Sequence, residues 1–208
     1  MSASACAARE SGYSEKAPAA AGNDALASAK REAFVTAMSG AVTGVSVVAT
    51  NGPVGRFGLT VSAVASVSAD PPMVLACINR RSPAAAAIQA NGVFSVNLLA
   101  AHQSNVSDVF AGRVANGTPY DFDCAEWHEG PTGCPLLREA AASFDCVVES
   151  AHGAGTHVVL IGRVVHALGA ERGPLAHHRR SYWTALRTAP FIGTNGGAPG
   201  ENREIGKA

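Results

Sequence analysis

Short apolar runs with strand-like alternation dominate the middle of the chain, and clusters of turn residues separate them. Strands are predicted over residues 43–50, 59–68, 73–78, 93–100, 142–152 and 156–169. Most of these strands follow one another through turns, as at Asn51–Arg56 and Asp70–Pro72, and few follow a helix. The pattern therefore favours an antiparallel barrel over a parallel sheet.

Two helices are predicted beside these strands, one before the first strand and one between the strands 93–100 and 142–152. Residues 24–39 have helical periodicity, with Asp24 as a candidate N-cap and Gly40 as the stop. Residues 102–112 suit a short helix closed by Gly112. No repeat of solenoid length is present, so we expect a single domain.

The two ends of the chain differ from the middle in composition. Residues 1–22 are rich in Ala and Ser without periodicity, and we expect a disordered N-terminal tail. Residues 190–208 are rich in Gly and Pro, and we expect a flexible C-terminal tail. The domain is then predicted over residues 23–189, within the usual size of a single folding unit.

Composition excludes some partners. The 16 basic and 16 acidic residues cancel, which argues against nucleic acid or a membrane as the main partner, because both need a basic surface. The apolar stretch 33–50 is interrupted by Ser, Thr and Gly, and fits a helix end and a strand better than a membrane span. Five cysteines without a C-x-x-C pair, and an N-terminus without a signal-peptide core, predict a reduced, cytoplasmic protein.

The predicted strand 59–68 carries a row of small hydroxyls. The alternation assigns Leu59, Val61, Ala63, Ala65 and Val67 to the core, and Thr60, Ser62, Ser66 and Ser68 to the opposite face, with Val64 as the exception. An ordinary solvent-facing strand and a platform for a planar ligand both fit this pattern.

The next strand leads directly into a helix start. Ser82 is a favoured N-cap, Pro83 suits the first helical position and Gly92 the C-terminal stop. The strand also brings Asn79 and Arg80 to this helix N-terminus, where the helix dipole favours anions. An ordinary capped helix is the alternative; together with the hydroxyl row, however, the pattern fits a flat ring with a phosphate, such as a flavin nucleotide.

Four stretches in this order resemble the flavin reductase-like family: GLTVSAVASVSADPPMVLACINRRS, GVFSVNLLAAHQSNVSDVFAG, GCPLLREAAASFDCVV and GTHVVLIGRVV. The resemblance covers about residues 30–187. It implies a mainly β fold, a split β-barrel with a few short flanking helices, usually homodimeric. It also implies an NAD(P)H:flavin oxidoreductase that binds FMN or FAD, takes hydride from NADH or NADPH, and supplies reduced flavin to a separate flavin-dependent oxygenase.

Carried over by position, the resemblance also implies site residues. Those expected to bind the flavin are Thr60, Val61, Ser62, Ala63, Cys77, Asn79, Arg80, Ser82, Phe110, Ala111, Gly112 and Tyr182. His157 is expected near the nicotinamide and the flavin ring as the catalytic residue, and no metal is expected. Many relatives have Gly-Asp-His where this chain has Gly155-Thr156-His157, and a tyrosine after Pro-Leu where it reads PLAHHRRSY. The choice between NADH and NADPH stays open.

Two other functions stay open as well. A flavin-binding carrier or electron-transfer module without reductase turnover would keep the platform and lose the nicotinamide site. An enzyme with tightly held flavin could instead reduce a quinone or a metal chelate.

Elsewhere in the chain, His177-His178 with Arg179-Arg180 is predicted to be an exposed polar turn rather than a metal or phosphate patch, because no partner has ligand spacing. Trp127 is predicted to anchor the core or a dimer contact.

Overall fold

The computed structural model describes residues 30–184 of the chain. Its N-terminal part, which ends at Ala37, is a separate compact unit. Helix α1 (Arg31–Met38) lies in this unit except for its last residue, and none of its residues is buried. Asp24 and both predicted tails lie outside the described residues. No helix within residues 30–184 is long and apolar enough to cross a membrane.

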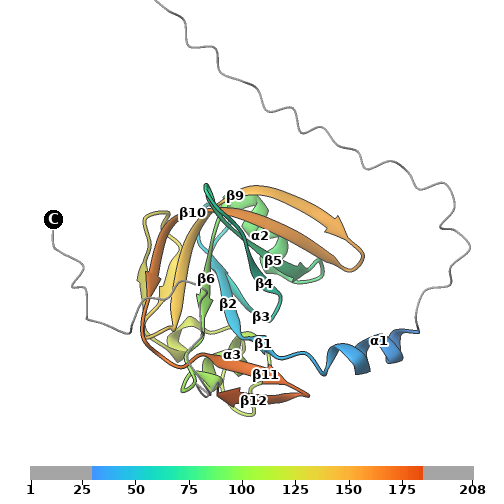
Figure 1. The fold of residues 1–208 in the computed structure, drawn as a ribbon. Helices are drawn as coiled ribbons and strands as arrows, with labels where there is room; N and C mark the ends of the chain where they lie inside the picture. Colours follow the sequence, from blue (N-terminus) through green and yellow to red (C-terminus); the bar gives the residue numbers. More distant parts are fainter. Residues whose placement is uncertain (1–29, 185–208) are drawn as a thin grey trace, which may run out of the picture. The chain divides into compact units, whose positions relative to one another are not determined.

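Seven strands of the second unit form one antiparallel sheet in the order β3-β2-β6-β9-β10-β5-β4. Their bounds are β2 Ser46–Thr50, β3 Phe57–Val61, β4 Val64–Ala69, β5 Pro72–Asn79, β6 Val93–Leu98, β9 Ala142–Ala154 and β10 His157–Gly169. Figure 1 shows the long β9–β10 hairpin curving across the molecule. The prediction of a mainly β, antiparallel fold is therefore confirmed.

The two edge strands of this sheet, β3 and β4, are consecutive in the chain. Only Ser62 and Ala63 separate them. The carbonyl of Ala63 accepts a hydrogen bond of 3.0 Å from the amide of Cys77 on β5. Because the three steps from the end of β3 to the start of β4 span at most about 10 Å, the sheet must curl until its two edges approach each other.

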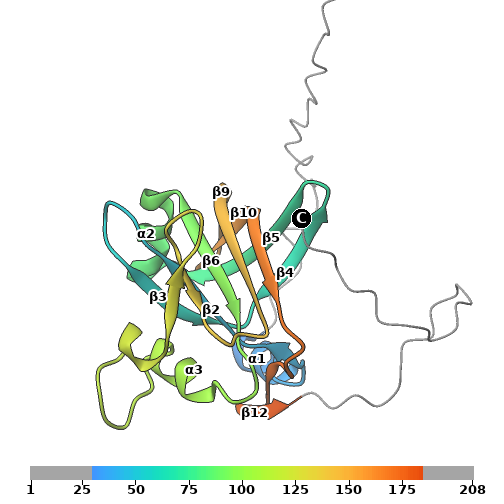
Figure 2. The ribbon, with the colours of Figure 1, turned by 90° about the vertical axis from the view of Figure 1, so that its left-hand side faces the viewer.

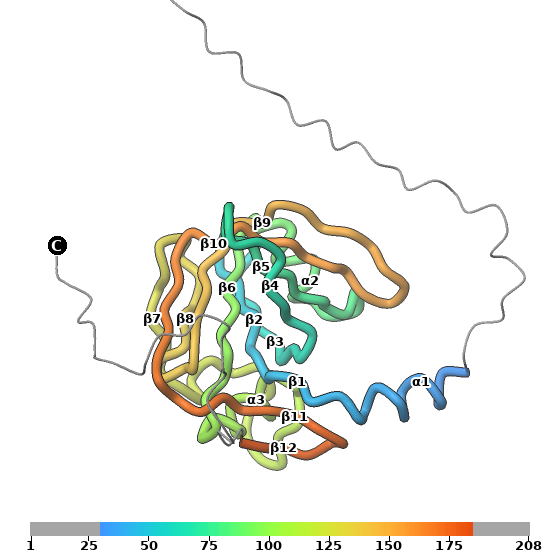
Figure 3. Tube along the Cα trace, in the orientation of Figure 1, coloured from blue at the N-terminus to red at the C-terminus, as the bar shows by residue number. Residues whose placement is uncertain are grey.

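The remaining elements lie around the sheet. One small sheet has the order β1-β11-β12, and another pairs β7 with β8. The bounds of these strands are β1 Thr43–Gly44, β7 Trp127–Glu129, β8 Pro135–Leu137, β11 Leu175–His178 and β12 Ser181–Thr184. Three helical segments connect strands, namely α2 Pro83–Asn91, α3 Ser104–Phe110 and η2 Phe122–Cys124. In Figures 1 and 2, α3 and β12 lie at the lower end of the sheet and α2 toward its upper end. The tube in Figure 3 shows β7 and β8 beside β9 and β10.

The core has two parts because β2 is covered on both faces. Val48 packs with Ile78, Phe94 and other residues of one hydrophobic cluster, whereas Val47 packs into a second cluster on the opposite face of β2. Alternate residues of a strand point to opposite faces, so a strand buried on both sides needs no polar face. All five residues of β2 are in fact buried.

A buried asparagine fixes the position of β8. The Nδ2 of Asn97 donates to the carbonyls of Val47 and Pro135, at 3.2 and 3.3 Å. Its Oδ1 accepts from the amide of Leu137 at 2.8 Å and from the Ser143 hydroxyl at 2.9 Å. Since an unpaired buried amide would be costly, these bonds specify how β8 packs on the large sheet.

The prediction of one strand over residues 59–68 is wrong. The chain bends at Ser62, and the alternation does not continue into β4. Val64, the predicted exception, packs against the core, whereas Ala65 and Val67 are exposed. An irregularity between Ser66 and Ser68 shifts the register once more.

Candidate functional site

A cavity of about 250 Å³ opens where β3, α3 and the β11–β12 hairpin meet. Four of its residues were predicted from the sequence, namely Thr60, Ser62, Ala111 and Tyr182; the others are Val45, Ser107, Arg113 and His177. The fold thus brings three distant segments of the chain to one hollow.

Hydrogen bonds to Ser107 connect the walls of this cavity. The hydroxyl of Thr60 on β3 donates to the Ser107 carbonyl at 2.7 Å. The Tyr182 hydroxyl on β12 lies 2.9 Å from Ser107 Oγ and 2.7 Å from Asp108 Oδ1. Arg113 Nη2 donates to the same tyrosine oxygen at 3.2 Å. The platform strand, α3 and β12 are therefore held together at the cavity.

Tyr182 keeps its proton in this environment. Burial raises the pKa of its hydroxyl, and the hydrogen bond between this hydroxyl and Ser107 acts in the opposite direction. The neighbouring Asp108 raises the pKa further, since its carboxylate accepts from the neutral hydroxyl and repels a phenolate. At neutral pH the cavity therefore presents a neutral phenol.

The turn from β5 into α2 forms the second part of the site. The amide of Arg80 donates to the Thr156 carbonyl at 3.1 Å, and its Nε donates to the His157 carbonyl at 3.2 Å. A side chain at Gly153 would collide with the Arg80 guanidinium, which lies across this glycine. The side chain of Arg80 is thus oriented by the β9–β10 hairpin.

The helix start that follows is the predicted one. Helix α2 has Ser82 at the N-cap, Pro83 at the first position and Gly92 in the left-handed conformation at the C-cap. The Ser82 hydroxyl, however, makes no capping hydrogen bond. Asn79 Oδ1 instead accepts from the Arg81 amide at 2.9 Å. The Ser82 hydroxyl is therefore available to a ligand at the helix N-terminus.

His157 stands beside this turn. It is exposed, begins β10 and pairs in register with Asn79 of β5. Thr156 Oγ1 lies 2.9 Å from its Nδ1. Thr156 thus gives Nδ1 a hydrogen-bond partner, which leaves Nε2 for a ligand.

Ser62 and Ala63 connect the two parts. Both are exposed, and Ala63 bonds to Cys77, whose side chain is half-buried. One continuous strip of residues therefore runs from the cavity at Thr60 to the helix start at Ser82.

Two predicted contacts cannot be made by side chains. Val61 is 5% exposed and belongs to the core. Phe110 is 1% exposed and packs edge-on against Phe122 and Trp127, with centroids 4.9 and 5.6 Å apart. Only the backbones of Val61 and Phe110 remain for a ligand. Trp127, predicted to anchor the core or a dimer contact, is partly buried and packs against the core.

Sequence reasoning missed Ser107, Arg113 and His177 as cavity residues. Ser107 lies on α3 and Ala111, four residues later, is the C-cap of this helix, so helical periodicity could have put them on one face. His177 pairs with Tyr182 across a hairpin that the sequence did not predict.

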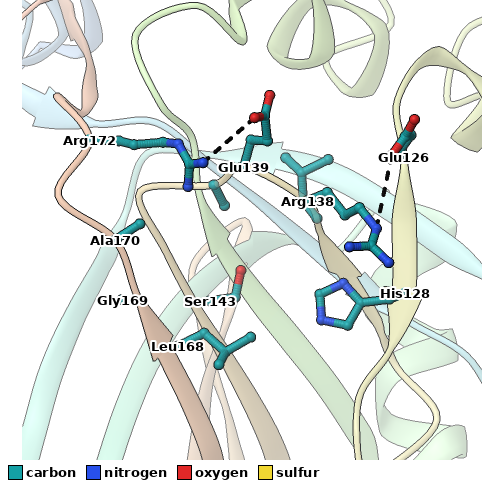
Figure 4. A pocket seen from close by; sticks show the side chains of 11 residues that line it. Glu126, His128, Arg138, Glu139, Ser143, Leu168, Gly169, Ala170 and Arg172 are labelled. Atoms are coloured by element: carbon teal, nitrogen blue, oxygen red, sulfur yellow. Dashed lines mark ion pairs between the residues drawn. The ribbon is translucent and has the colours of Figure 1, made fainter. Parts of the chain in front are cut away.

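A larger cavity, of about 580 Å³, contains none of the predicted residues. Figure 4 shows its charged side chains facing one another. Arg138 lies 3.9 Å from Glu126, and Arg172 lies 3.6 Å from Glu139. Because these charges already neutralise each other, the cavity has no evident preference for an ionic ligand.

Comparison with known proteins agrees with the fold. Residues 38–185 match the model of the flavin reductase like domain, and the chain belongs to this family. It is 43% identical to the FMN reductase (NADH) RutF of Variovorax paradoxus over 152 residues, which cover 72% of this chain and 82% of that protein.

Two solved structures are also similar. BorF, the flavin reductase component of a bacterial two-component tryptophan halogenase, has 32% identity and a TM-score of 0.66, with 74% of this chain and 98% of that chain covered. The NADH:FAD oxidoreductase SgcE6 of Streptomyces globisporus, in complex with NAD and FAD fragments, has 26% identity and a TM-score of 0.68, with 81% and 99% covered.

Proposed function

We propose that this protein is an NAD(P)H-dependent flavin reductase that supplies reduced flavin to a separate monooxygenase. The observation that carries the proposal is the continuous strip from the hydroxyl-lined cavity at Thr60 and Ser62 to the helix start at Ser82. Its relatives are named FMN reductase (NADH), and BorF is the reductase of a two-component system. FMN with NADH is accordingly the proposed pair, with FAD and NADPH as the alternatives.

The residues present fit a flavin nucleotide. Small side chains at Ser62 and Ala63 let a planar ring approach the backbone, and both are exposed. The unbonded Ser82 hydroxyl, the Arg80 guanidinium and the dipole of α2 suit the terminal phosphate. The neutral Tyr182 hydroxyl lines the cavity at the other end of the strip.

The chemistry needs orientation more than acid–base catalysis. Bound flavin supplies the hydride acceptor, and the nicotinamide supplies the hydride. The chain has to hold the two rings together at reacting distance and exclude water. His157 would orient the nicotinamide or the flavin ring through its free Nε2, while Thr156 holds its Nδ1.

The same proposal includes a split β-barrel, a homodimer and a cytoplasmic location. The approach of the edge strands β3 and β4 supports barrel closure. The exposed side chains of Val67 on β4 and Trp183 on β12 support a protein contact, since large apolar side chains often mark interfaces.

The test is NADH oxidation at 340 nm by purified protein, first without flavin and then with excess FMN, FAD or riboflavin. Saturable turnover on added flavin is expected, with FMN preferred. Tight flavin binding without turnover on NADH or NADPH would favour the carrier function. Turnover that requires a quinone or a metal chelate would favour an enzyme that uses tightly held flavin to reduce such an acceptor.

A further inference from the structure

The turn between β11 and β12 has an unusual composition for its geometry. His178 pairs with Ser181, so Arg179 and Arg180 form a two-residue hairpin loop. Both arginines have positive φ, 46° and 65°. Loops of this kind favour Asn-Gly, because side chains strain a left-handed backbone. Strained residues of this sort concentrate at functional sites.

The two guanidinium groups have no partners. Within residues 30–184, neither takes part in a hydrogen bond, an ion pair or a ring contact. Four other arginines are paired with carboxylates, namely Arg113, Arg138, Arg163 and Arg172. In a chain of zero net charge, the turn is thus a local concentration of uncompensated positive charge.

The same hairpin lines the cavity. His177 precedes the turn by two residues and Tyr182 follows it by two, and both are cavity residues. At about 3.3 Å per strand residue, the arginines lie roughly 7 Å beyond the cavity lining, within reach of their long side chains. In Figure 1 the β11–β12 turn and the β9–β10 turn, next to His157, extend toward the same side of the molecule.

We propose that Arg179 and Arg180 bind the pyrophosphate of the nicotinamide dinucleotide while its ring stacks on the flavin ring at the cavity. This inference rests on the function proposed above. A pyrophosphate is separated from the nicotinamide ring by one ribose, and it carries two negative charges that a pair of adjacent guanidinium groups can match. The terminal flavin phosphate has its own site at Arg80 and Ser82, at the other end of the strip.

The natural geometry of the turn supplies the test variant. Arg179→Asn with Arg180→Gly removes both charges and inserts the sequence that this loop favours, so the fold should be at least as stable. Arg179→Lys with Arg180→Lys keeps both charges and is the matched control. Steady-state rates are measured for both variants with NADH, NADPH and dihydronicotinamide riboside, which has the ring and ribose without any phosphate.

We expect the Asn-Gly variant to raise KM for NADH and for NADPH about tenfold, the equivalent of one lost charge-assisted contact. The KM for dihydronicotinamide riboside, the melting temperature and the flavin Kd should not worsen, and the Lys-Lys variant should restore most of the affinity for NADH.

An unchanged KM for NADH would overturn the inference. An equal rise for the riboside would also overturn it, because the turn would then shape the ring pocket. A rise with NADPH alone would assign the arginines to the 2′-phosphate and reject the pyrophosphate. If the wild-type protein oxidises none of the three donors, the proposed function itself fails, and the inference with it.

Discussion

Ser62 tests the platform at the scale of one residue. It is exposed at the bend between β3 and β4 and lines the cavity. Ser62→Trp should fill the space of the flavin ring and reduce flavin affinity by about 100-fold or more, while the thermal unfolding midpoint stays near that of the wild type. Fluorescence titration with FMN measures the loss. Ser66→Trp, on exposed β4, is the control, and equal flavin binding by all three proteins would reject the platform.

Arg80 tests the phosphate site. Arg80→Glu should weaken FMN binding roughly 10- to 100-fold, because a charge-assisted contact is lost and a repulsive charge introduced. Riboflavin, which has no phosphate, should bind almost as well as before. Arg81→Glu is the neighbouring control, since the Arg81 side chain has no partner within residues 30–184. Calorimetry measures the Kd of both ligands. Equal losses of affinity for FMN and riboflavin would show that the FMN phosphate does not bind at this turn.

His157 tests the role of orientation. His157→Ala should slow hydride transfer roughly 10- to 100-fold through misorientation of the rings. Flavin affinity should change little, because the Arg80 side chain bonds to the backbone carbonyl of His157, which the substitution keeps. Stopped-flow reduction of bound flavin at saturating NADH separates the two effects. Unchanged single-turnover rates would make the histidine structural.

At the scale of the element, the sequence predicted what local rules determine. Helix α2 follows from Ser82, Pro83 and Gly92, and β9 and β10 follow from their long apolar alternation. Strands β7, β8, β11 and β12 have only three or four residues and were missed, because their partners and not their own periodicity make them strands. Of the candidate site, the part from Thr60 to Ser82 could be predicted from one continuous segment, whereas Ala111 and Tyr182 were predicted only from the family resemblance. Ser107 and His177 join it only through tertiary packing.

The end of α3 offers a test at this scale. Gly112 has a φ of +69°, and a Cβ there would lie 2.6 Å from the Tyr120 hydroxyl. Gly112→Ala should cost about 1–2 kcal/mol of unfolding free energy, from backbone strain and displacement of the ring. Gly92→Ala, at the end of α2, is the control, because Gly92 has nearly the same φ, +72°, and a Cβ there meets nothing within 4 Å. Urea unfolding should show the larger loss of unfolding free energy for Gly112→Ala. An equal loss in both variants would show that the contact with the Tyr120 ring does not contribute.

At the scale of the whole molecule, buried thiols make stability depend on alkaline pH. Burial raises the pKa of Cys146 from 9.0 to about 12, and the neighbouring Asp145 and Cys134 add to the rise. Burial also raises the pKa of Cys134. A folded-state pKa above the unfolded one means that the folded state holds its proton longer. The contribution of these thiols to stability is therefore constant below about pH 9 and is lost as the pH rises toward 12.

The loss should be about 1.4 kcal/mol per pH unit for a single thiol over this interval. Cys146→Ala removes the titrating group at the expense of a small cavity, so the variant should be less stable than the wild type at pH 7. Its unfolding free energy should nevertheless fall less steeply between pH 9 and 11, and the two curves should converge. Urea unfolding at pH 7, 9, 10 and 11 provides the comparison. Parallel curves would mean that the thiol of Cys146 ionises in the folded protein as it does in the unfolded chain. The loss of stability at alkaline pH would then come from another group, such as Tyr182, whose pKa is also raised by burial.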